Sequence, residues 1–104
     1  MAEGARARPS SREPSRATAR EAAELARQSI AEMTELQPVQ MTSVSPTDDG
    51  WLVEVEVLED RRIPSSSDIL AVYEVELDAT GELLAYRRIR RYLRSQTGNG
   101  GYSE

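Results

Sequence analysis

Two segments of alternating residues constrain the fold of this chain most. In GWLVEVEVLED, residues Gly50–Asp60, and in ILAVYEVELD, residues Ile69–Asp78, apolar side chains occupy every second position. A period of two places these side chains on one face of a β-strand and their neighbours on the other. Because Glu54, Glu56, Glu74 and Glu76 occupy intervening positions, each segment is predicted to be a strand of an antiparallel sheet with one buried and one solvent-exposed face.

The second segment leads directly into a turn. Asp78 and Gly81 occupy the first and fourth positions of a type I turn, which predicts a three-residue hairpin loop over residues 79–81 with Gly81 in the left-handed region. This turn sets a register in which Asp78 faces Glu82. The register pairs Leu77 with Leu83, Val75 with Ala85 and Ala71 with Ile89 on the buried face, and Glu76 with Leu84 and Glu74 with Tyr86 on the exposed face, with Arg88 diagonal to Glu74. The residues after Tyr86 also have a helical pattern, but the hairpin favours a strand to about Arg91.

Residues 18–38 have the pattern of an amphipathic helix. Thr18 is a candidate N-cap with Glu21 three residues later, and Pro38 ends the pattern. Apolar or small residues recur every three or four positions as one stripe, which consists of Ala22, Leu25, Ala26, Ser29, Ile30, Met33 and Leu36. We expect this stripe to pack on the chain's own sheet; docking into a partner protein is the alternative. Residues 39–45 alternate weakly and are predicted to form an edge strand.

These segments together predict one small α+β domain over residues 17–94. One N-terminal helix is expected to pack on an antiparallel β-meander of three to four strands. Residues 1–16 contain two prolines and scattered charge without an aromatic residue, so we expect a disordered tail there. Residues 95–104 are expected to be a flexible C-terminal tail.

The composition excludes many catalytic and metal-binding chemistries. The 104 residues include no histidine and no cysteine, which removes the commonest general base, the commonest metal ligand and every thiolate site. We therefore expect neither an enzyme nor a bound metal or other cofactor. No apolar segment approaches the roughly 20 residues that span a bilayer, so a cytoplasmic protein without a membrane partner is expected.

Charged side chains on the predicted exposed face are the candidate contacts for a partner. They are Glu54, Glu56, Glu74 and Glu76 on the two alternating strands, and Arg87, Arg88, Arg90 and Arg91, interleaved with Tyr86 and Tyr92, on the last strand. Arginines and glutamates on neighbouring strands form exposed ion pairs worth about 0.2–1 kcal/mol each, so pairing within the chain is one interpretation. The arginines also disfavour a cation site among the glutamates.

Two further interpretations of the arginine strand involve a partner. One is contact with an acidic protein surface. The other is nucleic-acid binding, because arginines bind phosphate while tyrosines stack on bases. The net charge of −5 opposes the field that nucleic-acid binding requires, so this is the less favoured of the two.

Short motifs follow one another in a distinctive order between residues 50 and 93. They are Gly-Trp at 50–51, Val-Glu-Val-Glu-Val at 53–57, Arg-Ile-Pro at 62–64, Asp-Ile-Leu at 68–70, Tyr-Glu-Val-Glu-Leu-Asp at 73–78, Gly-Glu-Leu at 81–83, Tyr-Arg-Arg at 86–88 and Arg-Arg-Tyr at 90–92. In this order they resemble the gas vesicle protein O family (GvpO). The resemblance implies a small cytoplasmic accessory protein needed for forming gas vesicles, the gas-filled protein shells that give cells buoyancy, rather than the shell protein itself.

The resemblance further implies a non-catalytic interaction module. Its expected partners are other gas vesicle proteins, accessory or shell, and its expected location includes association with gas vesicles. The resemblance assigns no site residues, so the candidate contacts rest on the residue pattern alone. A nucleic-acid-binding or regulatory protein that uses the C-terminal arginine and tyrosine strand is the alternative.

Overall fold

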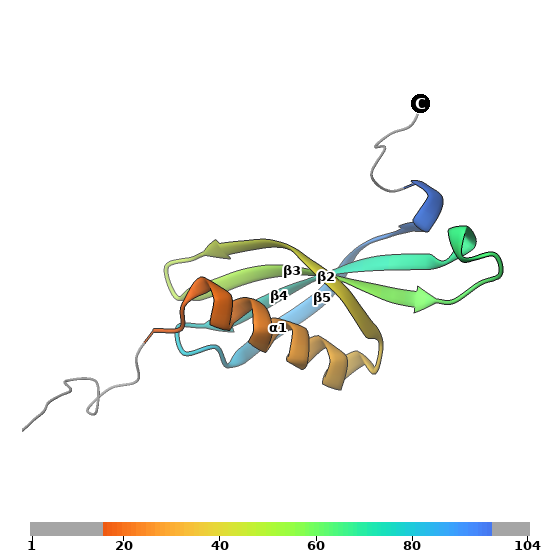
Figure 1. Cartoon of the computed structure of the whole chain (residues 1–104). Coiled ribbons are helices and arrows are strands. Elements are labelled where there is room, and N and C mark those ends of the chain that lie inside the picture. Colours follow the sequence, from red (N-terminus) through yellow and green to blue (C-terminus); the bar gives the residue numbers. More distant parts are fainter. Residues whose placement is uncertain (1–15, 97–104) are drawn as a thin grey trace, which may run out of the picture.

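The computed structural model describes residues 16–96, which form one helix and a four-stranded sheet (Figure 1). Helix α1 spans Ala19–Thr34, and strands β2, β3, β4 and β5 span Gln37–Pro46, Gly50–Asp60, Ile69–Asp78 and Leu83–Leu93. The strands lie in chain order, and each pairs with the next in antiparallel fashion. Short 3₁₀ turns, η2 (Ser65–Ser67) and η3 (Arg94–Gln96), follow β3 and β5. The predicted α+β meander is confirmed, whereas residues 1–15 and 97–104 of the two predicted tails lie outside the described residues.

Local chemistry fixes both ends of α1. The Thr18 hydroxyl accepts a hydrogen bond from the Glu21 N–H at 3.1 Å, and the Glu21 carboxylate accepts one from the Thr18 N–H at 2.9 Å, so the predicted capping box forms. Glu35 ends the helix in the left-handed conformation, with φ of 61°, and its N–H donates to the Ala31 carbonyl. The helix therefore ends before Pro38, which lies in β2 instead of marking the break.

The apolar stripe of α1 packs on the sheet, as predicted. Ala22, Ala26 and Ile30 are fully buried, whereas Met33 at the edge of the stripe is 54% exposed. The sheet contributes the apolar side chains of the two alternating segments, which are Trp51, Val53, Val55, Val57, Ala71, Val75 and Leu77. Figure 1 shows α1 lying along this face, with η2 and η3 at the end of the sheet that extends past the helix. Burying each larger side chain stabilises the fold by roughly 1.5–3 kcal/mol, so this layer is the main source of stability.

Two glycines permit close approaches between the elements. A Cβ at Gly50 would lie 2.0 Å from the Leu77 carbonyl oxygen, so glycine is required where β3 begins beside β4. Gly81 has φ of 99°, as the predicted turn requires, and a Cβ there would lie 2.3 Å from Leu25 Cδ1. Hydrogen bonds from the Gly81 N–H to the Asp78 carbonyl and from the Asp78 N–H to the Glu82 carbonyl close the turn. The predicted turn and its facing pair are confirmed.

The register of β5 departs from the predicted one after its first pair. Leu77 pairs with Leu83 as predicted, but Leu84 forms a bulge and a second bulge follows at Ile89. The observed pairs are Glu76 with Ala85, Val75 with Tyr86, Glu74 with Arg87, Tyr73 with Arg88, Val72 with Arg90 and Ala71 with Arg91. The predictions that paired Val75 with Ala85, Ala71 with Ile89, Glu76 with Leu84 and Glu74 with Tyr86, and placed Arg88 diagonal to Glu74, were therefore wrong.

The first bulge has a physical reason in the size of the side chains that it redirects. It turns the ring of Tyr86 toward the layer under α1, where the ring centroid lies 6.1 Å from that of Tyr73. It leaves the small side chain of Ala85 exposed. Burying a tyrosine ring removes more apolar area from water than burying a methyl group, which favours the bulged register.

A second apolar cluster lies on the face of the sheet away from α1. Leu70 is 2% exposed and Val72 is fully buried, yet neither belongs to the cluster under α1. Strand register places them on the same face as Leu58, Glu56 and Tyr92. This cluster occupies the half of the face near the β3–β4 connection. The other half, near the two hairpin turns, carries no covering element within residues 16–96.

Candidate functional site

Most of the predicted contact residues lie on the sheet surface opposite α1, which we call the outer face. Register and alternation place on it Leu52, Glu54, Glu56, Leu70, Val72, Glu74, Glu76, Ala85, Arg87, Arg90 and Tyr92. The bulges in β5 place Tyr86, Arg88 and Arg91 on the same side as α1. The ten candidates therefore do not form one surface.

Glu56 is buried, contrary to the prediction of a solvent-exposed glutamate. It is 6% exposed, and its Oε1 accepts a hydrogen bond from Gln40 Nε2 at 3.1 Å while its Oε2 accepts one from the Tyr92 hydroxyl. Tyr92 of β5 lies opposite Leu70 of β4, and Glu56 of β3 lies opposite Val72 of β4. The tyrosine side chain therefore crosses β4 to reach Glu56, which explains why this part of the outer face is buried. Burial and the hydrogen bond to Glu56 raise the pKa of Tyr92 to about 12. Glu56 and Tyr92 thus link strands of the sheet to one another.

The other three glutamates of the outer face differ in what they contact. Glu74 forms an ion pair with Arg87 at 3.0 Å, as expected for a cross-strand pair, although the arginine predicted near it was Arg88. Glu54 has a contact of 3.5 Å with the Thr42 hydroxyl. Glu76 is exposed and makes no ion pair with any other residue in the range 16–96. Glu54 and Glu76 therefore carry charges that no ion pair within residues 16–96 neutralises.

Three of the four candidate arginines form ion pairs within the chain. Arg87 pairs with Glu74, and Arg88 and Arg91 both bind Glu59, at 2.8 and 2.7 Å. Arg90 lies with its guanidinium carbon 6.0 Å from the centroid of the Tyr92 ring, within range of a cation–π contact. Pairing within the chain, one of the three interpretations of these arginines, is thus present in the structure.

The structure also shows important residues that the sequence pattern did not indicate. Glu59 is the shared partner of two arginines. Asp68 is 2% exposed and accepts hydrogen bonds from the Arg62 backbone N–H at 2.7 Å and the Arg94 guanidinium at 3.3 Å. The backbone hydrogen bond is the main cause that lowers the pKa of Asp68. These partners are up to 32 residues apart in the chain, so only the order of the strands could have revealed them.

Arg16, which was assigned to the N-terminal tail, contacts the folded domain. Its guanidinium donates to the Gly50 carbonyl at 2.7 Å and lies 5.0 Å from the centroid of the Trp51 ring. Trp51 is 8% exposed, and its indole N–H is buried without a hydrogen-bond partner in the described part of the chain. Arg16 therefore covers the edge of the buried layer at Trp51.

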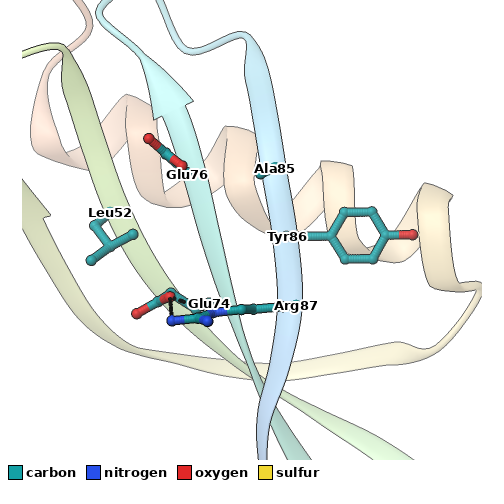
Figure 2. Close-up of a pocket in the computed structure, with 6 residues that line it drawn as sticks. All are labelled: Leu52, Glu74, Glu76, Ala85, Tyr86 and Arg87. Carbon is teal, nitrogen blue, oxygen red and sulfur yellow. Dashed lines mark hydrogen bonds and ion pairs between the residues drawn. The ribbon is translucent and has the colours of Figure 1, made fainter.

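A shallow hollow lies in the outer face near the hairpin turns (Figure 2). The residues that line it are Leu52, Glu74, Glu76, Ala85, Tyr86 and Arg87. Figure 2 shows the ion pair between Glu74 and Arg87 on one side of this hollow, with the ring of Tyr86 directed away from Leu52 and Glu76. We call Leu52, Glu54, Glu74, Glu76, Ala85 and Arg87 together the hairpin-side surface. It combines apolar side chains with carboxylates and is the part of the outer face best suited to contact another molecule.

No group of three or more acidic side chains within residues 16–96 is arranged to hold a metal ion. Over the same range, the helix is too short and too polar to cross a membrane.

Comparison with known proteins identifies the family. The family model described as "Gas vesicle synthesis protein GvpO" matches residues 5–98. Gas vesicle protein O of a Streptomyces species is 59% identical over 51 residues, which are 49% of this chain and 40% of that protein. Gas vesicle protein O1 of Halobacterium salinarum is 43% identical over 47 residues, 45% of this chain and 40% of that protein.

A third relative, gas vesicle protein O of Haloferax mediterranei, is 44% identical over 46 residues, 44% of this chain and 33% of that protein. The matched segment thus spans at most 40% of the length of these relatives. No solved structure matches the chain. Since the family model covers most of the sequence, this chain belongs to the gas vesicle synthesis protein GvpO family.

Proposed function

We propose that this chain is an accessory protein required for gas vesicle formation and that it acts in the cytoplasm as a non-catalytic interaction module. Membership of the gas vesicle synthesis family supports the process. The observation that carries the mode of action is the hairpin-side surface, an uncovered part of a sheet that joins apolar and charged side chains. Surfaces of this mixed kind are suited to binding proteins.

The charge of the strands supports an accessory role over a place in the wall of the vesicle. A wall that holds gas requires a continuous apolar surface. Here the face of the sheet that α1 leaves uncovered carries Glu54, Glu74, Glu76 and Arg87, and the apolar face is already occupied by α1. The partners in this proposal are other gas vesicle proteins, accessory or shell.

The described geometry gives less support to the nucleic-acid alternative. Arginines that bind phosphate must be free to replace its counterions. Arg87, Arg88 and Arg91 are instead engaged by Glu74 and Glu59. A phosphate would have to displace these carboxylates from a chain whose net charge is −5.

Complementation of a deletion strain tests the proposed function. Loss of the gene is expected to abolish or sharply reduce gas vesicles, measured by buoyancy and electron microscopy, while immunoblots still detect the shell protein. Expression of the chain from a plasmid should restore the vesicles. Normal vesicles in the deletion strain would refute the proposal. Loss of the shell protein itself would indicate instead that the chain controls expression of the shell protein.

A further inference from the structure

The charged side chains of this domain are segregated along the length of the sheet. Because the sheet is a meander, the β2–β3 and β4–β5 turns lie at one end, and the β3–β4 connection and η3 lie at the other. The first end carries mainly acids, namely Asp48, Asp49, Glu54, Glu74, Glu76, Asp78 and Glu82, with Arg16 and Arg87 among them. The second end carries most of the arginines of the domain, namely Arg61, Arg62, Arg88, Arg90, Arg91 and Arg94. The domain therefore has an acidic end and a basic end.

The two ends differ in how far their charges are neutralised. At the basic end, Arg62 pairs with Asp60, Arg88 and Arg91 with Glu59, and Arg94 with Asp68. At the acidic end, Glu74 is the one carboxylate that has an ion pair with a residue in the range 16–96. Within the described residues, ion pairs thus neutralise most of the basic charges and few of the acidic ones.

One of the uncompensated carboxylates is held opposite another carboxylate by the strand register. Glu54 lies directly opposite Glu74 across the β3–β4 ladder, on the same face of the sheet. Like charges in this position destabilise a sheet. Arg87 binds Glu74 but leaves Glu54 with the hydroxyl of Thr42 as its polar contact. A positive charge from outside would relieve this repulsion.

The carboxylates surround apolar side chains that no element within residues 16–96 covers. Leu52 lies opposite Glu76 in the register and is half-buried, and Ala85 is exposed on the other side of Glu76. Figure 2 shows Leu52, Glu76 and Ala85 around the same hollow, with α1 behind the strands. The surface offers apolar contact area next to negative charge.

We propose that the hairpin-side surface binds a cationic segment of another gas vesicle protein, in which an arginine or lysine stands beside an apolar side chain. The cation pairs with Glu54 and Glu76, and the apolar side chain covers Leu52 and Ala85. This proposal rests on the proposed function as an interaction module and gives the chemistry of the partner. The partner charge is opposite to the acidic one expected from the arginine strand alone, since three of the four arginines form ion pairs within the chain.

The test uses the purified chain and each purified gas vesicle protein of the same organism as separate probes. Binding is measured by isothermal titration calorimetry at 50 and 300 mM salt. We expect at least one probe to bind, and we expect Glu54→Gln/Glu76→Gln to weaken that binding about tenfold at low salt and to reduce its salt dependence. The matched control is Glu32→Gln/Glu35→Gln, which makes the same change in net charge on and beside the outward side of α1 and should bind as the unmodified chain does.

A second measurement reads the chemistry of the partner directly. The probe protein that binds is divided into overlapping synthetic peptides of 15 residues. Peptides that bind should contain an arginine or lysine next to an apolar residue, and replacing that cation with glutamine should abolish binding. Selective binding of acidic peptides, or loss of binding in Arg88→Gln/Arg91→Gln but not in the glutamate variant, would overturn the proposal.

The outcomes separate this inference from the proposed function. If no gas vesicle protein binds the unmodified chain at 100 μM, the interaction module itself is refuted. If one binds and Glu54→Gln/Glu76→Gln leaves its affinity and salt dependence unchanged, the module stands and the cationic partner is refuted. Thermal melts of both variants serve as the folding control, and the glutamate variant should melt no lower than the unmodified chain because it removes a repulsion.

Discussion

The hydrogen bond between Tyr92 and buried Glu56 gives the sharpest test of how this sheet is stabilised. Tyr92→Phe keeps the ring on the outer face of the sheet but removes the hydroxyl that donates to Glu56 Oε2. Hydrogen bonds to charged groups contribute about 1.5–3 kcal/mol, and the lower part of this range applies because Tyr92 is only partly buried. We expect the free energy of unfolding to fall by about 1.5–2 kcal/mol, which is roughly 6–16 °C in melting temperature for a domain of this size.

The measurement is urea unfolding followed by the fluorescence of Trp51, the one tryptophan of the chain. Trp51 lies near the hairpin turns, so a single transition there also tests whether both ends of the sheet unfold together. Tyr73→Phe is the matched control, because the Tyr73 hydroxyl makes no hydrogen bond to a residue described in the structure. A Tyr92→Phe variant within about 0.5 kcal/mol of the unmodified chain would refute the stabilising role of this bond.

The same bond predicts a dependence of stability on alkaline pH. The pKa of Tyr92 is raised from 10.0 to about 12, because burial and the acceptor at Glu56 favour the protonated hydroxyl in the folded state. The contribution of this group is therefore complete below pH 10 and is lost as the pH rises through 12. The difference in stability between the unmodified chain and Tyr92→Phe should be constant from pH 7 to 9 and should shrink between pH 10 and 12. A difference that persists at pH 12 would contradict the assignment.

Three further perturbations test the fold. Trp51→Ala should cost about 3–5 kcal/mol, because Trp51 is 8% exposed and heads the buried layer; an unchanged circular dichroism melt would place it outside the core. Gly81→Ala should cost about 1–2 kcal/mol from the positive φ alone, with a further loss from the contact with Leu25, and a melt equal to that of the unmodified chain would mean that the turn can rearrange. Deletion of residues 1–15, which leaves Arg16 over Trp51, should change the melting temperature by less than about 5 °C, and a larger fall would assign those residues to the packed structure.

Features decided by near neighbours in the chain could be predicted from the sequence. The capping box needs only Thr18 and Glu21, the hairpin turn needs only Asp78 and Gly81, and the alternation of β3 requires one buried face. The end of α1 was less predictable, because the left-handed residue is Glu35, a type that rarely adopts this conformation.

Features decided by contacts across the sheet could not be predicted in this way. The bulge at Leu84 forms because burying Tyr86 stabilises the fold more than burying Ala85 would. Predicting this requires the position of Tyr73 on the neighbouring strand. The same alternation predicted Glu54 and Glu56 to be equally exposed. Tyr92, 36 residues away, buries Glu56 alone. The ion pairs of Arg88 and Arg91 likewise depend on Glu59, which is not one of the glutamates in the alternating pattern.

Irregularities occur along both edges of the sheet. In β2, the pairing with β3 shifts at two places and Pro38 and Pro46 lack N–H donors, while β5 carries the bulges at Leu84 and Ile89. An incoming strand from another chain could not form an unbroken ladder on either edge. Copies of this domain are therefore poorly suited to polymerise by edge-to-edge addition, even at high local concentration. A copy bound to a partner protein would not offer an open strand edge to which the next copy could add. The number of copies in an assembly would then be limited by the number of binding sites on the partner.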